Sequence, residues 1–404
     1  MSYTKSQGDP ETVQPPHIYA ELLPNLRHMN IHVTLHHEHN GTEEVELLND
    51  RYTLRVTQDG CTASIDLPAR IKEDVTLALS AEKTRQLDWR LGNCHLRQDV
   101  NEDAQNGTPW LADSITVDTH TACKSCKTII AGDGAVRIWK ALPSENWAEM
   151  MEFWHCHKPI DHNANSDLDA AISSKAYSAS NKPRTLPGVG LVGVSNIVLS
   201  EEDCSNIKSG EANTIQCNTC SHPLGTHDSI FSGLRLDKWS LSLRRPNCTE
   251  WTTYPTEKHL TSLLLSLAES NVVRRFMLYS GKLETATEGL LVWLFNPSIY
   301  YSLSSPLPSK NPPEGKPASS LKSKPSPSSP ISSQHASTIL YHPVVKPSTT
   351  VRKHSSEMDE LQIPEIVLGE IRKALEGSTE MLPEEKREVR SSVERWRVGV
   401  LGRW

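Results

Sequence analysis

The sequence predicts an α+β fold with a β-rich core that is pinned by a four-cysteine zinc site. Short segments of alternating or β-branched residues recur along the chain and are separated by Asp-Gly or Gly-rich turns, which predicts the β-rich core. Two Cys-x-x-Cys pairs, far apart in the sequence, predict the zinc site. Helical periodicity follows the first pair and returns near the C-terminus, so we expect helices after the first zinc hairpin and at the C-terminus.

The first third of the chain is expected to consist mainly of strands. Residues 31–35, 51–56 and 61–67 alternate in polarity or carry β-branched side chains. Asp59 and Gly60 stand between the last two segments, and this dipeptide favours the tight turns that join neighbouring antiparallel strands. We therefore expect a hairpin here.

A second hairpin is expected directly after the first cysteine pair. Its strands would be 127–131 and 135–140, which flank a turn over Gly132, Asp133 and Gly134. Further strands are expected at 191–199, 234–243, 272–279 and 338–345.

Four segments have the features of helices. The first begins with Ser144 as N-cap, and Trp147, Met150, Met151 and Trp154 follow at the i, i+3, i+4 and i+7 spacing of one apolar helix face. The remaining helical segments are 257–269, 363–375, which has Pro364 in its first turn, and 384–398, which Pro383 precedes.

A segment near residues 304–333 consists mostly of Pro and Ser and contains one acidic residue. Such a composition buries too little apolar surface to offset the entropy of ordering, which predicts disorder. The expected organisation is a disordered N-terminus at 1–16, a β-rich zinc-bound core at 17–302, a disordered insertion at 303–336, and a returning strand with C-terminal helices packed on the core at 337–404.

The cysteine pairs are Cys123 with Cys126 and Cys217 with Cys220. Two such pairs on turns supply four soft ligands in the tetrahedral arrangement by which structural zinc is held. Because a four-thiolate site has no open position for a substrate, this zinc would hold the fold together. Two alternatives stay open: unrelated turns with buried cysteines, and a redox pair.

A second dense cluster, Trp154 to Lys158, follows the first helical segment and contains Cys156 between two histidines. A neighbouring His or Lys lowers the pKa of a thiol, so Cys156 is the candidate nucleophile. The alternatives are a cluster that packs or caps the helix end, and a second metal site made by Cys94, His95, Cys156 and His157.

A run of histidines near residue 36 is the last candidate. His36, His37 and His39 could bind a metal ion or form a solvated strand end.

Composition and charge exclude several classes of function. The net charge of −7 and the isoelectric point near 6.2, without a dense Lys/Arg run, indicate no binding to nucleic acid or anionic membranes. The apolar runs are far shorter than the roughly 20 residues that cross a bilayer, and residues 1–16 lack the apolar centre of a secretory signal. The odd number of nine cysteines suits a reducing compartment. We expect a protein partner and a cytoplasmic location, with the nucleus left open.

A set of motifs is spread along the chain: the two cysteine pairs, Leu142-Pro143-Ser144 to Trp147, Glu149-Met150, Trp154, Cys156-His157-Lys158-Pro159, Leu224-Gly225 after the second pair, the stretch from Leu234 to Trp239, and the stretch from Trp396 to Leu401. Together these motifs resemble one family, the HECT-like ubiquitin ligases that bind ubiquitin-conjugating enzymes. They cover most of the chain outside the Pro/Ser segment and the first residues.

The resemblance implies a ubiquitin-protein ligase that accepts ubiquitin from a ubiquitin-conjugating enzyme and transfers it to protein substrates. A true HECT domain carries its thioester-forming cysteine near the C-terminus, but no cysteine follows Cys248 here. A ligase of this sequence would use an upstream cysteine, with Cys156 as candidate, or work without a covalent intermediate.

The paired cysteines and the Leu-Gly dipeptide also resemble zinc-bound β-tent domains, in which one ion pins two hairpins; this likeness concerns the fold alone. The second functional hypothesis is a non-catalytic zinc-pinned binding module, or a stabilising chaperone for a nuclear RNA-processing factor.

Overall fold

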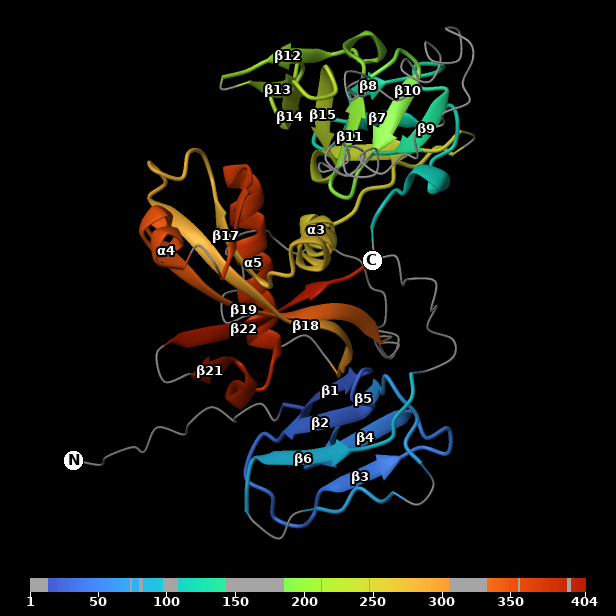
Figure 1. The fold of residues 1–404 in the computed structure, drawn as a ribbon. Helices are drawn as coiled ribbons and strands as arrows, with labels where there is room; N and C mark the ends of the chain where they lie inside the picture. The colour runs from blue at the N-terminus through green and yellow to red at the C-terminus, as the bar shows by residue number, and fades with distance from the viewer. Residues whose placement is uncertain are drawn as a thin grey trace, which may run out of the picture. The chain divides into compact units, whose positions relative to one another are not determined.

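A computed structural model describes residues 14–72, 75–79, 83–96, 108–142, 185–211, 213–246, 248–304, 333–354, 357–390 and 394–404. The chain divides into two compact units (Figure 1). The terminal unit is built from both ends of the sequence, residues 1–106 and 267–404, and the central unit comprises residues 107–266. The expected helix at 144–154 and most of the two segments predicted to be disordered lie outside the described residues, and the predicted domain boundaries stay a prediction.

The terminal unit contains a large mixed sheet with the strand order β21-β22-β19-β18-β1-β2-β6. Strand β17 pairs with β18 and also, in parallel, with β20. The strands are β1 (His17–Leu23), β2 (His28–Thr34), β6 (Gln86–Leu91), β17 (Arg275–Tyr279), β18 (Glu288–Leu303), β19 (Gln334–Val345), β20 (Asp359–Gln362), β21 (Glu388–Arg390) and β22 (Arg395–Gly402). Because β1 pairs with β18, the two ends of the chain share one sheet.

A second, three-stranded sheet packs near the N-terminal strands of the terminal unit. It consists of β3 (Glu44–Leu47), β4 (Thr53–Gln58) and β5 (Cys61–Asp66). Leu54 and Ile65 of this sheet share one buried core with Ile31 of β2. The predicted hairpin is confirmed, because β4 pairs with β5 around Asp59 and Gly60, which both have positive φ angles.

Three α-helices are present among the described residues: α3 (Thr256–Asn271), α4 (Pro347–His354) and α5 (Glu365–Met381). Helix α5 confirms the helix expected at 363–375, although it begins after Pro364 and continues to Met381. It packs on β22, and its Ile371 and Leu375 are fully buried. The two elements touch so closely that a Cβ atom at Gly399 would lie 2.8 Å from Leu375 Cδ2. The main-chain N–H of Val400 also donates to Ser378 Oγ across this contact at 2.8 Å.

The prediction of a helix at 384–398 is wrong. This stretch instead forms the short 3₁₀ helix η5 (Glu384–Lys386), strand β21 and the start of β22. Trp396 and Val398 are buried on either side of the partly exposed Arg397, and β22 pairs with β19 from Arg397 to Gly402. The period of two and a ready strand partner therefore outweigh the helix propensity of the Glu, Lys and Arg residues.

The central unit holds two sheets around one apolar core. The larger sheet has the order β12-β13-β14-β15-β11-β10-β9, and the smaller one the order β16-β7-β8. The strands are β7 (His120–Cys123), β8 (Ile129–Ala131), β9 (Ile138–Ala141), β10 (Val189–Val192), β11 (Asn196–Leu199), β12 (Ile207–Ser209), β13 (Thr214–Cys217), β14 (Pro223–Asp228), β15 (Gly233–Asp237) and β16 (Leu241–Arg244). With its three described helices and dominant strands, the protein confirms the predicted β-rich α+β class.

The hairpin expected across Gly132 to Gly134 is wrong. Strand β8 pairs with β7 of the smaller sheet, whereas β9 runs parallel to β10 in the larger one. The Gly-rich turn therefore carries the chain from one sheet to the other. The hairpin forms one strand earlier because the turn at the first cysteine pair folds β8 back on β7.

Candidate metal centre

The first cysteine pair occupies a tight turn between β7 and β8. The main-chain N–H of Cys123 donates to the carbonyl of Thr128, and the N–H of Lys127 donates to the carbonyl of Cys123, both at 2.9 Å. Lys127 has a φ of 61°, in the left-handed region. This left-handed residue reverses the chain directly after Cys126, so both thiols end on the same side of the turn.

The second pair repeats the same turn between β13 and β14. The N–H of Cys217 donates to the carbonyl of His222, and the N–H of Ser221 donates to the carbonyl of Cys217, again both at 2.9 Å. Ser221 has a φ of 58° and stands where Lys127 stands in the first turn. The two pairs therefore lie on equivalent turns, one from each sheet of the central unit.

The four thiols meet in one cluster. Cys123 Sγ lies 3.7 Å from Cys220 Sγ, Cys126 Sγ lies 3.6 Å from Cys217 Sγ, and all four sulfur atoms lie within 4.8 Å of one another. Zinc–sulfur bonds of about 2.3 Å in a tetrahedron place the sulfurs about 3.8 Å apart. The cluster is therefore consistent with a zinc site. The four residues that it contains are those predicted from the sequence.

The ionisation of the cysteines differs with their position. Burial raises the pKa of Cys123, whereas the hydroxyl of Thr128, 3.2 Å from Cys126 Sγ, lowers the pKa of Cys126. Lys127 stays close enough to the Cys123 sulfur for their charges to interact, and its Nζ donates to Ser242 Oγ at 2.8 Å. A basic residue at this point offsets part of the negative charge that four metal-bound thiolates carry.

Close packing explains why a Leu-Gly dipeptide follows the second cysteine pair. Leu224 is fully buried in the central core. Gly225 pairs with Leu236 of β15, and a Cβ atom at this position would collide with the main-chain carbonyl oxygen of Arg235. The glycine lets β14 approach β15 directly behind the metal centre.

Cys156 and His157 lie outside the described residues, and with them the predicted nucleophile and half of the predicted second metal site. Cys94, the other cysteine of that site, belongs to the apolar core of the terminal unit, and burial raises its pKa. Its thiol lies 3.7 Å from the carbonyl oxygens of Leu91 and Gly92.

The remaining described cysteines differ in their access to solvent. Burial raises the pKa of Cys204 to about 12. Cys61 is partly exposed and Cys248 is exposed. Cys248 borders a cavity of about 290 Å³ that Trp110 and Tyr254 also line.

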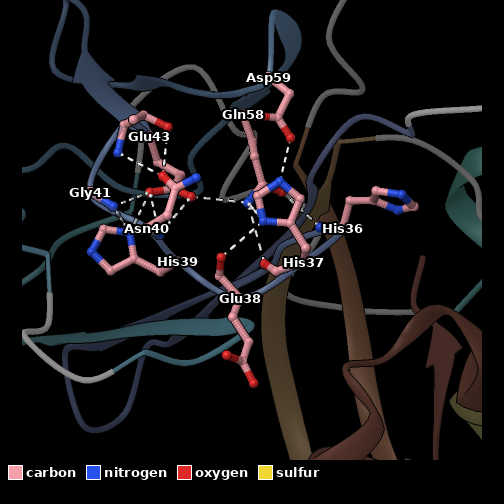
Figure 2. Close-up of polar contacts among 10 residues, drawn as sticks. His36, His37, Glu38, His39, Asn40, Gly41, Glu43, Gln58 and Asp59 are labelled. Carbon is pink, nitrogen blue, oxygen red and sulfur yellow. Dashed lines mark hydrogen bonds and ion pairs between the residues drawn. The ribbon is translucent and has the colours of Figure 1, made fainter.

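The three histidines near residue 36 do not converge on one point (Figure 2). His37 Nε2 contacts the carboxylate of Asp59 on the surface, whereas His39 Nδ1 contacts Glu43, which is buried. His39 is itself buried, so only part of this segment is the solvated strand end that was one of the two expectations.

Sequence reasoning missed Glu43 and Gln58, which organise this loop. The carboxylate of Glu43 accepts hydrogen bonds from Gln58 Nε2 at 3.0 Å and from the main-chain N–H groups of Asn40 and Gly41 at 3.2 and 3.1 Å. These bonds to the charged form lower the pKa of Glu43 to about 2. The one sign of this role in the sequence was the spacing of four residues between His39 and Glu43, which contact each other.

The sequence indicated Lys238 only as part of the motif from Leu234 to Trp239. Its side chain is fully buried. Its Nζ donates to the carbonyl oxygens of Pro109 and Trp110 at 2.8 and 3.0 Å, and burial lowers its pKa to about 7. The lysine therefore holds the bend at Pro109 and Trp110 where the chain enters the central unit.

None of the helices in the described parts of the chain is long and apolar enough to cross a membrane.

Comparisons with known proteins agree with the motifs. The sequence matches the family model described as HECT-like ubiquitin-conjugating enzyme (E2)-binding over residues 21–394. It is 25% identical over 296 residues to an uncharacterized protein of Saccharomyces cerevisiae, covering 70% of this chain and 78% of the yeast protein. It is 23% identical over 300 residues to an uncharacterized protein of Schizosaccharomyces pombe, covering 72% and 76%. No solved structure matches the chain. The family model spans most of the sequence, and the chain therefore belongs to the HECT-like E2-binding family.

Proposed function

We propose that this protein is a ubiquitin-protein ligase that accepts ubiquitin from a ubiquitin-conjugating enzyme and transfers it to protein substrates. The match to an E2-binding family over residues 21–394 carries the proposal. The partners are the conjugating enzyme, ubiquitin and a protein substrate, and we place the reaction in the cytoplasm, with the nucleus left open. Reduced thiols, which this reaction needs, persist in those compartments.

The cofactor in this proposal is one structural zinc ion bound by Cys123, Cys126, Cys217 and Cys220. The sulfur geometry fits a tetrahedral ion, and the four thiolates fill its coordination. Since each sheet of the central unit contributes one pair, the ion would tie the two sheets together.

The proposed nucleophile is Cys156. Its thiolate would attack the carbonyl carbon of the thioester between ubiquitin and the conjugating enzyme, a new sulfur–carbon bond would form, and the enzyme's cysteine would leave as a thiolate. A substrate lysine amine would then attack the new thioester and release Cys156. Burial argues against Cys94 and Cys204 in this role, because a nucleophilic thiol needs access and a low pKa.

A transfer assay with charged conjugating enzymes tests the proposal. The wild-type chain should form a ubiquitin adduct that thiol reductants remove, and Cys156→Ala should abolish it. Cys248→Ala is the matched control, because Cys248 is the exposed cysteine among the described residues outside the metal cluster. An adduct that survives Cys156→Ala and disappears in Cys248→Ala would move the reaction to the cavity beside Trp110.

One observation favours a second candidate, a binding module that engages the conjugating enzyme without a thioester. Burial raises the pKa of Cys94 and of Cys204, so these two described cysteines outside the metal cluster are poorly suited to form a thioester. The alternative is therefore a non-catalytic zinc-pinned binding module, or a stabilising chaperone for a nuclear RNA-processing factor. Binding without any reducible adduct, measured in the same assay, would select this function.

A further inference from the structure

The terminal unit contains a second group of potential metal ligands, which involves no cysteine. It consists of His32 on β2, Asp88 on β6 and Glu385 on η5. His32 Nδ1 contacts Asp88 Oδ1 directly and lies 3.9 Å from Glu385 Oε1. One donor atom from each residue lies within 4.8 Å of the others.

The sheet and a neighbouring turn preorganise this group. His32 and Asp88 are opposite each other in the register of β2 and β6, so their side chains project from the same face of the sheet. Glu385 comes from the turn that follows α5, almost three hundred residues further along the chain. Gln86 Nε2 donates to Glu385 Oε2 at 2.6 Å and so fastens this turn to the edge strand β6.

The next residue on the turn, Lys386, forms its ion pair with Glu21, and its positive charge also acts on His32. Its Nζ lies 2.6 Å from Glu21 Oε1 and 5.7 Å from the centre of the Tyr19 ring. Within the described parts of the chain, His32 is the basic residue whose ion pairs reach Asp88 and Glu385. Two carboxylates therefore converge on one imidazole.

We propose that His32, Asp88 and Glu385 bind a divalent transition-metal ion such as manganese or zinc. One imidazole nitrogen and two carboxylate oxygens form a nitrogen–oxygen donor set that suits these ions and does not suit soft Cu(I). The site is independent of the four-cysteine centre and of the proposed ligase reaction.

The site remains open to solvent and to a further ligand. The side chains of Asp88 and Glu385 are 54% and 37% exposed, and a cavity of about 370 Å³ borders Asp88 and Gln86. Three protein ligands leave positions for water or a partner's carboxylate, in contrast to the closed four-thiolate cluster.

Manganese is the appropriate probe, because it prefers oxygen ligands and competes poorly for thiolates. Mn²⁺ would be added to the full-length, zinc-loaded chain, and the free ion would be quantified by electron paramagnetic resonance. We expect one equivalent to bind without release of zinc. Asp88→Asn and Glu385→Gln should each weaken binding at least about tenfold. Glu384→Gln, an exposed neighbour with the same chemical change, should bind as the wild type does.

A second measurement decides the matter even if a variant fails to fold. In wild-type chain labelled at histidine, bound Mn²⁺ should broaden the imidazole resonances of His32 first. The proposal is overturned if no Mn²⁺ binds at millimolar concentration, if both carboxylate variants bind with unchanged affinity, or if the broadening centres on another histidine.

Discussion

The side chain of Glu43 has no exposed surface (Figure 2). Replacing Glu43 with Gln removes its negative charge and preserves the shape of the side chain. The carboxylate accepts bonds from His39, Gln58 and two main-chain N–H groups. A hydrogen bond to a buried charged group contributes about 1.5–3 kcal/mol, and the new amide group can no longer accept at one of the two oxygen positions. We expect the free energy of unfolding of the terminal unit to fall by about 3 kcal/mol.

Thermal unfolding at pH 7 followed by circular dichroism measures this loss. For a unit of this size, about 3 kcal/mol corresponds to a fall in melting temperature of roughly 6–12 °C. Glu38→Gln is the matched control, because Glu38 is exposed and the chemical change is identical. Its expected effect is within about 0.5 kcal/mol. Equal melting temperatures for the two variants would refute the assignment of Glu43 as the organiser of the loop.

The same variant has a defined pH dependence. The pKa of Glu43 is lowered to about 2 in the folded protein, compared with about 4.3 in an unfolded chain. A lowered folded-state pKa contributes stability that is fully present above the unfolded pKa and is lost as the pH falls towards 2. The difference in stability between wild type and Glu43→Gln should therefore be constant above about pH 5 and shrink below it. A difference that grows in acid would contradict the sign of this shift.

Three further predictions concern the metal centre and the glycines. Zinc should co-purify at one equivalent. Cys123→Ser and Cys217→Ser should both lose the zinc and lower the melting temperature of the central unit, because each removes one of four ligands. Elemental analysis that finds full zinc in either variant would show that the pairs do not share an ion. Gly225→Ala should prevent stable folding of the central unit, since its methyl group would strike the backbone of β15; a soluble variant with wild-type zinc content and proteolytic resistance would contradict this. Gly399→Ala should destabilise the terminal unit by about 1–3 kcal/mol, because the added methyl group overpacks against α5. Gly377→Ala, whose methyl group meets open space within α5, should stabilise the terminal unit by up to about 1 kcal/mol. Thermal melts with the opposite order would contradict the packing of α5 on β22.

The clustering of the four cysteines was predictable because each pair carries its information locally. Two residues between Cys217 and Cys220 suffice to define a turn that aims both thiols at one point, whatever the rest of the fold is. Strand 61–67 was predictable for a similar reason, because its alternation and the Asp-Gly turn act over a few residues. These signals do not depend on distant partners.

The features that were missed depend on distant partners. The segment 384–398 has charges that suit a helix, but β19 offers it a strand edge and the core accepts Trp396. Glu43 looks like one of many surface carboxylates until Gln58, the last residue of β4, donates a hydrogen bond to it. A single sequence contains no sign of either encounter.

The division into a terminal and a central unit has a consequence for the order of events during synthesis. The central unit has all of its strands once residue 266 has been translated, and it can fold as the chain emerges. Strand β1 must wait for β18, and β19 must wait for β22 at the far end of the sequence. During that wait the edge of β1 that later pairs with β18 is open to other chains. A ribosome that stalls after residue 266 would therefore release a folded middle attached to an aggregation-prone start.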